Sequence, residues 1–427
     1  MDFAMAMKYI EEKNKLGSVP GLDNVKELLL RLGNPQDSCK CLQIAGTNGK
    51  GSVFSFVQEI LIDAGYSVGR YISPTIFTYL ERFQINKNYI SEEAFSKILT
   101  EVSDKVSEME KDGLESPTAF EIETAVAFMY FKYNKVDYAL IECGMGGDLD
   151  ATNVISKPVM SVIASISMDH MQFLGNTLTE IATHKAGIIK DNSVCVMAPQ
   201  PDEVIEVFDK VCRNMHTELV CVDETAINIQ DMTTEKTVFI YDGETYNIRL
   251  LGEHQVINAT LAIEAARRIS GITINNIRAG LEKTTWRGRL THVCDMPDVY
   301  VDGAHNEAAW KYLKKAINKY FTKRKIIYIM GVLRDKEYHK MIDILADTMS
   351  YAITVTPDTP RGLEKEILAS LISDKGVGTI TADSAYAAIE AAKLKEKELY
   401  NMDDEKPVIL VCGSLSFISE YLLYDWK

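Results

Sequence analysis

The residues best suited to do chemistry form one glycine-rich segment, Gly46 to Ser52, with the sequence GTNGKGS. It follows a short apolar run that ends at Ala45 and precedes apolar residues with helical spacing, so it joins a predicted strand to a predicted helix. Backbone amides and the helix dipole favour phosphate at such a junction, and Lys50 adds a positive charge. The pattern departs from the usual GxxxxGK[ST] loop, because Gly51 follows Lys50 and moves the hydroxyl to Ser52. A structural glycine turn is the alternative, but the order of strand, loop, lysine and hydroxyl favours a nucleotide-phosphate site.

A second apolar run, Tyr138 to Ile141, is followed by the carboxylate of Glu142 and then by Cys143 to Gly147. An acid at the carboxyl end of a parallel strand, next to a phosphate loop, is well placed to hold Mg²⁺ on the nucleotide. An ordinary solvated strand end is the alternative. We interpret Cys143 as a small buried residue rather than as a catalytic thiol.

A third apolar run leads to Asp169 and His170, and Lys185 follows further along the chain. A lone histidine is more often structural than catalytic, and a lone lysine is usually a solvated charge. Spacing alone does not establish that these side chains meet.

The order of the elements predicts an α/β fold. Strand-length apolar runs alternate with helical sequence, which is typical of a parallel central sheet. Between residues 218 and 250 short alternating strands with a hairpin turn at Tyr241 to Glu244 predict a small antiparallel extension of the first domain. From Val299 a second strand-and-helix series predicts a Rossmann-like α/β domain without the dinucleotide glycine fingerprint. Residues 2–16 and 22–32 predict two N-terminal helices, separated by a turn cluster at residues 17–21.

A chain of 427 residues is too long for one hydrophobic core, so two domains are expected. The predicted division is a P-loop ATPase domain at 1–290, a linker at 291–297 and the Rossmann-like domain at 298–427.

Composition excludes several classes of protein. The formal net charge of −15 argues against nonspecific nucleic-acid binding, which depends on clustered Lys and Arg. No long uncharged apolar stretch and no cationic leader is present, so we expect no membrane association and a cytoplasmic location. The eight cysteines lack CxxC spacing, which disfavours a metal cage or a disulfide framework.

The segment Ile44 to Ser52 resembles the AGTNGKGS motif of the folylpolyglutamate synthase and dihydrofolate synthase family, which is part of the Mur ligase superfamily. Further family motifs follow in order, nearly end to end. They are Leu32-Gly33-Asn34-Pro35, Ser73-Pro74, Glu81-Arg82, Phe120-Glu121, Glu142 to Asn153, Asp169-His170, His184 to Gly187, His254-Gln255 with Asn258, Gly288-Arg289, Asp302 to Asn306, Asp335-Lys336 and Gly413 to Leu415. The chain departs from the family at Thr75-Ile76, where a His-Leu pair is usual.

The resemblance implies an ATP-dependent ligase that activates a folate-type carboxylate as an acyl phosphate and couples it to L-glutamate. It implies ATP as a substrate, two Mg²⁺ ions and a carbamylated lysine, with a monovalent cation as a further candidate. The implied partners are small molecules: a reduced folate or dihydropteroate, L-glutamate and MgATP. The protein is expected to be a monomer, with residues 298–427 as the glutamate-ligase domain.

The resemblance also assigns roles by position. The catalytic candidates are Lys50, Lys185, His170 and His305. The candidates for ATP binding are Gly46, Thr47, Asn48, Gly49, Lys50, Gly51, Ser52, Gln255, Asn258, Arg289 and Asp302. The candidate metal ligands are Ser52, Ser73, Glu142, His170 and Lys185 as a carbamate, and the candidates for folate binding are Arg82 and Phe120. The alternatives are an ordinary ammonium at Lys185, a helix-turn cap at Asp302 and a core ring at Phe120.

Two other functions use the same phosphate loop. A Mur-type ligase of cell-wall synthesis would act on a UDP-sugar peptide, but only about forty residues precede the loop, too few for the extra N-terminal domain. A P-loop small-molecule kinase would not need Asp302 and His305. Within the folate family, the resemblance favours an enzyme with both activities, as many bacterial members have, but leaves a single activity open.

Overall fold

The computed structural model describes residues 1–17, 21–400 and 405–426, which divide into two compact units. The first consists of Met1–Ile227 and Ile257–Lys283, and the second of Asn228–Val256 and Thr284–Lys427. The centre of the predicted turn cluster, residues 18–20, lies outside the described residues. The segment Asn228–Val256 packs with the second unit, although the sequence led us to expect it in the first domain. The predicted domain ranges 1–290, 291–297 and 298–427 therefore stay a proposal.

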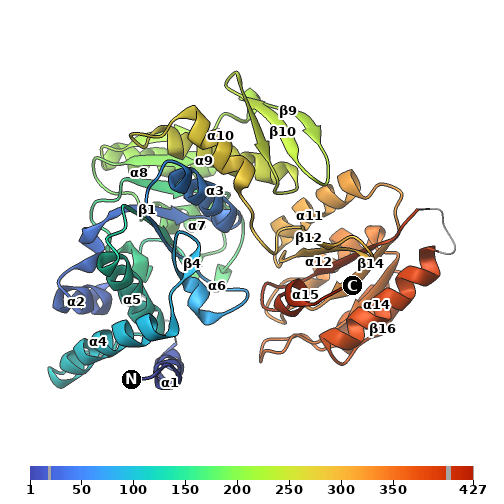
Figure 1. Cartoon of the computed structure of the whole chain (residues 1–427), viewed down its shortest axis with the longest axis horizontal. Coiled ribbons are helices and arrows are strands. Elements are labelled where there is room, and N and C mark those ends of the chain that lie inside the picture. The colour runs from blue at the N-terminus through green and yellow to red at the C-terminus, as the bar shows by residue number, and fades with distance from the viewer. Residues whose placement is uncertain (18–20, 401–404, 427) are drawn as a thin grey trace. The chain divides into compact units, whose positions relative to one another are not determined.

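An eight-stranded sheet forms the centre of the first unit (Figure 1). Its strands are β1 (Lys40–Ala45), β2 (Val68–Tyr71), β3 (Phe83–Ile85), β4 (Asn88–Tyr89), β5 (Tyr138–Glu142), β6 (Met160–Ile163), β7 (Val194–Met197) and β8 (Glu218–Cys221). They lie in the order β4-β3-β2-β5-β1-β6-β7-β8, and the pairs are parallel from β2 to β8. Because β1 lies between β5 and β6, the loops that follow these three strands meet at one edge of the sheet. The predicted parallel α/β fold is confirmed.

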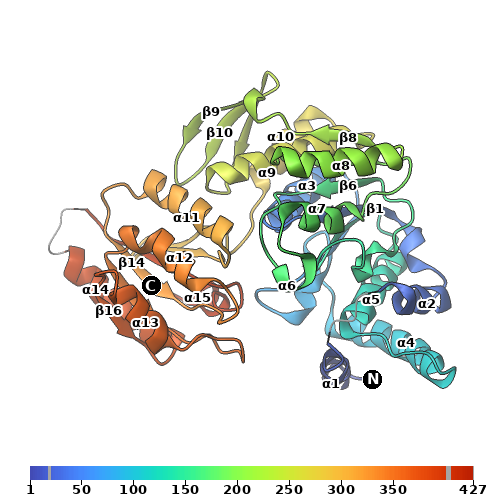
Figure 2. The ribbon, with the colours of Figure 1, turned by 180° about the vertical axis from the view of Figure 1, so that it is seen from behind.

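Figure 2 labels the helices of this part of the chain, of which the first two precede β1. They are α1 (Phe3–Asn14), α2 (Asp23–Arg31), α3 (Lys50–Asp63), α4 (Glu92–Lys111), α5 (Ala119–Tyr133), α6 (Met171–Leu174), α7 (Leu178–Ala186), α8 (Asp202–Asn214), α9 (Glu253–Arg267) and α10 (Ile274–Lys283). The two predicted N-terminal helices correspond to α1 and α2. Across the described residues, no helix combines the length and apolarity that a membrane crossing requires.

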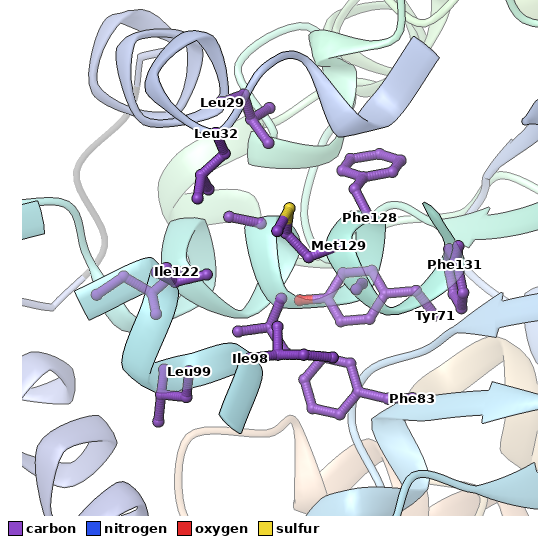
Figure 3. Close-up of a cluster of buried hydrophobic side chains, with 14 of the residues drawn as sticks. Leu29, Leu32, Tyr71, Phe83, Ile98, Leu99, Ile122, Phe128, Met129 and Phe131 are labelled. Carbon is purple, nitrogen blue, oxygen red and sulfur yellow. The ribbon is translucent and has the colours of Figure 1, made fainter. Parts of the chain in front are cut away.

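A large apolar core lies between the sheet and α2, α4 and α5 (Figure 3). Helix α5 begins with a capping box, in which the Thr118 hydroxyl accepts from the backbone N–H of Glu121 and the Glu121 carboxylate accepts from that of Thr118. It is buried on most of its circumference, as expected for a helix covered by the sheet on one side and by other helices on the other. Its rings Phe128 and Phe131 belong to the same core as Tyr71 of β2.

The second unit contains a six-stranded sheet and a smaller three-stranded one. The larger sheet has the order β12-β13-β17-β14-β15-β16 and is parallel except for β12 at its edge. Its strands are β12 (Thr291–Cys294), β13 (Asp298–Asp302), β14 (Ile326–Met330), β15 (Tyr351–Thr354), β16 (Thr379–Thr381) and β17 (Val408–Cys412), and its helices are α11 (Glu307–Tyr320), α12 (Tyr338–Leu345), α13 (Lys365–Ser373), α14 (Ala385–Tyr400) and α15 (Ser419–Leu423).

The smaller sheet consists of β9 (Ile227–Met232), β10 (Thr237–Tyr241) and β11 (Glu244–Ile248). The predicted hairpin turn at Tyr241 to Glu244 is confirmed, because β10 and β11 pair antiparallel with their ends at these residues. Asp242 and Gly243 have φ angles of 51° and 76°, which a two-residue turn between right-twisted strands requires.

Candidate active site

The glycine-rich segment forms a tight loop between β1 and α3, as the sequence predicts. Gly46 and Gly49 have φ angles of 151° and 89°, which a residue with a side chain rarely adopts. A Cβ atom at Gly46 would lie 2.8 Å from that of Ala164, and one at Gly49 would lie 2.5 Å from Oδ1 of Asn258. Both glycines are therefore needed for the loop to approach its neighbours closely, and the N-terminus of α3 points its backbone amides into this loop.

Asn258, predicted to bind the nucleotide, is buried on α9 against Gly49 of the loop. Gln255 lies one turn earlier on α9, in the part of the helix that packs with the second unit. Its side-chain amide donates to Nε2 of His254 at 3.2 Å. Nε2 therefore acts as the acceptor and carries no proton. Burial, with the nearby charge of Arg289, lowers the pKa of His254 to about 4, in keeping with a neutral ring.

Two lysines converge on one backbone oxygen. The Nζ atoms of Lys50 and Lys185 each donate to the carbonyl oxygen of Gly46 at 3.1 Å. Lys50 Nζ also lies 3.8 Å from the Glu142 carboxylate. Burial, followed by repulsion from Lys50, lowers the pKa of Lys185 to about 8. The structure therefore brings together Lys50, Glu142 and Lys185, which the sequence places far apart.

A small pocket opens at this edge of the first unit, between the loops that follow β1, β5 and β6. The residues that line it are Gly46, Thr47, Lys50, Cys143, Gly144, Met145, Gly146, Asp169, His170, Leu174 and Lys185. The predicted candidates His170 and Lys185 thus share one pocket with the phosphate loop. Burial raises the pKa of the Cys143 thiol to about 12, which agrees with an inert thiol.

The donor set around the loop fits a magnesium ion. The Ser52 hydroxyl is buried, and in the described part of the chain its oxygen has no hydrogen-bond partner. Glu142 adds a buried carboxylate at the end of β5. No group of three or more His, Cys, Asp or Glu side chains suited to a metal occurs among residues 1–17, 21–400 and 405–426. Mg²⁺ does not require such a cage, since it commonly binds one or two protein oxygens together with nucleotide phosphates and water.

The other predicted metal ligands lie on loops at the same unit. Ser73 follows β2 and is partly buried, and the bond to Pro74 is cis. His170 has a half-exposed side chain and a left-handed backbone, φ 49°, at the start of α6. The structure places His170 at the pocket and gives Ser73 no place in its lining.

The predicted folate residues lie on the β2 side of the sheet. Phe120 stacks on Tyr71 with ring centroids 6.0 Å apart, and its ring packs against Gly144, where a Cβ atom would lie 2.8 Å from Cζ. It therefore contacts both the apolar core and a residue of the pocket lining. Arg82 Nη1 lies 3.3 Å from the Glu123 carboxylate, which also accepts from the Tyr79 hydroxyl at 2.7 Å.

The predicted second-domain residues meet at one turn after β13. The Asp302 carboxylate accepts from the backbone amides of Leu290 and Ala304, both at 2.7 Å. Burial raises its pKa, and the positive charge of Arg289 acts in the opposite direction. His305 Nδ1 donates to the Gly303 carbonyl at 2.9 Å. Asp302 therefore orders the turn before α11, whose N-cap is Asn306, and Arg289 and His305 flank this turn.

Sequence reasoning missed the residues that hold Lys185 in place. Nδ1 of His184 lies 3.0 Å from both carboxylate oxygens of Asp148. The Asn153 amide donates to the carbonyls of Asp148 and Gly187, at 2.9 and 3.1 Å. The loop after β5 is thus fastened to the end of α7. The signal lies in the motif Glu142 to Asn153, which contains both Asp148 and Asn153.

Residues 44–266 match the Mur ligase middle domain, and residues 288–415 match the glutamate ligase domain of Mur ligases. A dihydrofolate synthase/folylpolyglutamate synthase of Bacillus subtilis (strain 168) is 37% identical over 434 residues, which cover 97% of this chain and 97% of that protein. The folylpolyglutamate synthase of Lacticaseibacillus casei is 33% identical over 376 residues, covering 85% of this chain and 87% of its own.

Solved structures of similar proteins superimpose over nearly the whole chain. Folylpolyglutamate synthase of Mycobacterium tuberculosis, complexed with ADP and AMPPCP, gives a TM-score of 0.90 at 28% identity, with 99% of both chains covered. FolC of E. coli, in complex with DHPP and ADP, gives a TM-score of 0.86 at 26% identity and covers 99% of this chain and 97% of its own.

Proposed function

The chain belongs to the Mur ligase family, and we propose that it is the ATP-dependent ligase that joins L-glutamate to a folate-type carboxylate. The observation that carries this conclusion is the similarity, over 97% of both chains, to a relative that bears the names of both folate reactions. We propose that this chain likewise makes dihydrofolate from dihydropteroate and extends reduced folates with further glutamates. It would act as a monomer in the cytoplasm, where ATP is available.

The reaction proceeds in two steps. The substrate carboxylate attacks the γ-phosphorus of ATP, which forms an acyl phosphate and releases ADP. The amine of glutamate then attacks the acyl carbon, the amide bond forms, a proton is lost from nitrogen and inorganic phosphate leaves. Lys50 and the amides of the loop at Gly46 to Ser52 would bind the phosphates and offset their charge. Water must be kept from the acyl phosphate, so the pocket has to close around it before it forms.

We assign the magnesium site to Ser52 and Glu142, with Ser73, His170 and a carbamate on Lys185 as the remaining candidates. Bound Mg²⁺ would neutralise charge on the phosphates. Ser52 offers a buried oxygen without a hydrogen-bond partner among the described residues, and Glu142 offers a carboxylate near Lys50. A second Mg²⁺ and a monovalent cation are the further candidates.

The convergence of the two lysines supports carbamylation of Lys185. Carbon dioxide reacts with a neutral amine, and a pKa of about 8 keeps an appreciable fraction of Lys185 neutral near physiological pH. The new N–C bond replaces an N–H bond, the proton goes to water and the side chain becomes an anion. A cation next to Lys50 is thereby exchanged for a group that can ligate a metal.

Arg82 and Phe120 are our candidates for the folate. Phe120 borders the pocket at Gly144 and offers a ring face for stacking on the pterin. In the second unit, Arg289, Asp302 and His305 are the candidates for contacting the nucleotide, together with Gln255 and Asn258 of α9.

One assay separates this function from its rivals. The purified protein is incubated with Mg²⁺, ATP and labelled glutamate, with dihydropteroate in one sample and tetrahydrofolate in another, and ADP and incorporated glutamate are measured. We expect glutamate incorporation in both samples. ADP release only with UDP-muramyl substrates would favour a cell-wall ligase, and glutamate-independent phosphorylation of a stable metabolite would favour a kinase. Absence of turnover with both folate acceptors would refute the proposal.

A further inference from the structure

A fully buried arginine lies beneath the phosphate loop. Arg70 is on β2, next to β5, and its side chain is almost inaccessible to solvent. Its Nη1 donates to the Ser55 hydroxyl at 3.2 Å and to Oε1 of Gln58 at 3.1 Å, and its Nη2 donates to the Gly51 carbonyl at 3.2 Å. The Ser55 hydroxyl in turn donates to the same Gly51 carbonyl at 2.9 Å. The guanidinium thus fastens the first two turns of α3, the helix that carries Lys50 and Ser52.

Arg70 also neutralises the acids that surround this helix. Burial lowers the pKa of Arg70 to about 10, while the carboxylates of Glu142, Glu81 and Glu59 act in the opposite direction, with Glu142 the strongest. The guanidinium therefore stays charged at neutral pH. Glu142 is the strand-end carboxylate assigned to magnesium, and its charge is the strongest of those that raise the pKa of Arg70. Ser52, the other proposed magnesium ligand, lies on α3, the helix that Arg70 fastens.

Glu81, the second of these acids, binds the backbone of the loop that begins at Ser73. Glu81 is buried, and its Oε2 accepts from the backbone amides of Ile76 and Phe77 at 2.8 and 2.9 Å. These amides lie in the loop that begins at Ser73 and contains the departure from the family at Thr75-Ile76. A buried carboxylate with two backbone donors is stabilised further by a nearby cation. Among the charges that raise the pKa of Arg70, that of Glu81 is second to Glu142.

We propose that Arg70 is a positioning residue of the magnesium–nucleotide site, the buried cation that fixes the first turns of α3 and with them Lys50 and Ser52. The proposal rests on the proposed ATP-dependent function. Arg70 does not line the pocket, so its effect on the nucleotide is exerted through the residues it holds. Groups that orient metal ligands in this way typically change metal affinity about 10–100-fold when they are removed.

The test compares Arg70→Met, which removes the charge, with Arg70→Lys, which retains it. ADP binding is measured by calorimetry over a magnesium titration, at a temperature where each variant is folded. We expect Arg70→Met to weaken Mg²⁺-dependent ADP binding about 10–100-fold and to raise the magnesium requirement, and Arg70→Lys to recover part of the loss. Leu99→Ala, in the apolar core on α4, is the control for a general loss of stability and should leave the magnesium requirement unchanged.

If folded Arg70→Met has the magnesium requirement and the ADP affinity of the wild type, the proposed role of Arg70 is wrong and the proposed function is unaffected. If Arg70→Met does not fold, Arg70→Lys and Ser55→Ala take its place, and wild-type binding in both would overturn the proposal equally. Failure of the wild-type protein to bind ADP with Mg²⁺ would overturn the ATP-dependent function together with the proposal.

Discussion

Carbon dioxide should stabilise this protein, because the ammonium form of Lys185 is unfavourable in the fold. The Nζ atoms of Lys50 and Lys185 each lie 3.1 Å from the Gly46 carbonyl oxygen, so the two nitrogens are within about 6 Å of each other. Two positive charges at that distance repel by roughly 3 kcal/mol at an effective dielectric constant of about 20. Burial and, after it, this repulsion lower the pKa of Lys185 from 10.5 to about 8, which corresponds to about 3 kcal/mol in total.

The sign of the effect follows from proton linkage. The folded state releases the Lys185 proton near pH 8, whereas the unfolded chain keeps it to about 10.5, so without carbon dioxide the penalty is full below pH 8. It is removed as the pH rises from 8 to 10.5, where the unfolded state binds more protons than the folded state. A carbamate would remove the penalty near pH 7.5.

The perturbation is Lys185→Met, which keeps an unbranched side chain, one atom shorter, and removes the amine. Unfolding by urea is measured at pH 7.5 in carbon dioxide-free buffer and in bicarbonate at the same ionic strength. We expect bicarbonate to stabilise the wild type, and we expect Lys185→Met to be unresponsive and more stable than the carbon dioxide-free wild type by about 1–3 kcal/mol. Lys190→Met is the matched control, because Lys190 is a partly buried lysine outside the pocket, and it should keep the response.

Activity gives an independent readout. Lys185→Ala should be inactive and should regain part of its turnover with short-chain carboxylic acids, which can occupy the position of the carbamate. An equal bicarbonate response in the wild type and Lys185→Met would refute the reasoning, as would full activity of Lys185→Ala without rescue.

Three further outcomes are expected. Lys50→Ala should lose about 2–4 kcal/mol of transition-state stabilisation, seen as a fall in kcat/KM for ATP, and a value near wild type would show that the loop is misassigned. His254, with a folded pKa of about 4 against 6.5 unfolded, should cost the wild type stability as the pH falls from 6.5 to 4; we expect a loss of at most about 2 kcal/mol relative to His254→Phe, and parallel pH profiles in urea unfolding would contradict this. Glu123→Ala should lower the free energy of unfolding by about 3–5 kcal/mol because it leaves the Arg82 guanidinium without its carboxylate, and Glu123→Gln, which keeps an acceptor for Tyr79, should lose less; wild-type stability of Glu123→Gln would argue against the ion pair.

The phosphate loop and the strand-end acid could be predicted because their signals are local. Glycines, a lysine and a hydroxyl between a strand and a helix constrain the backbone within a few residues. The placement of Glu142 needed one further step, that β5 and β1 are neighbours, and the register of the sheet confirms it by pairing Ile44 with Glu142. Alternation of apolar strands with helices was enough for that inference, since such strands form one parallel sheet.

Contacts between distant segments could not be predicted from spacing. Asn258 reaches Gly49 only because α9 returns to the first unit after the small antiparallel sheet. That sheet was expected in the first domain, since its strands follow β8 directly, yet Asn228–Val256 packs with the second unit. Hydrophobic patterning shows that a strand has a buried face and does not show which partner covers it. The burial of Arg70 could not be predicted either, because the sequence around a charged residue in a short strand does not show whether that residue is buried.

The carbonyl of Gly46 shows how a feature that is unfavourable for stability can identify a site. A fold selected for stability alone would not direct two lysines to one oxygen, since exposed lysines cost little and buried like charges cost several kcal/mol. The backbone at Gly46 requires a glycine, because its φ is 151° and a Cβ atom would have no room beside Ala164. The cost disappears when one amine meets phosphate and the other becomes an anion, as the proposed chemistry requires. Local conflicts of this kind are expected at functional sites, where the strain is balanced by a ligand rather than by the rest of the chain.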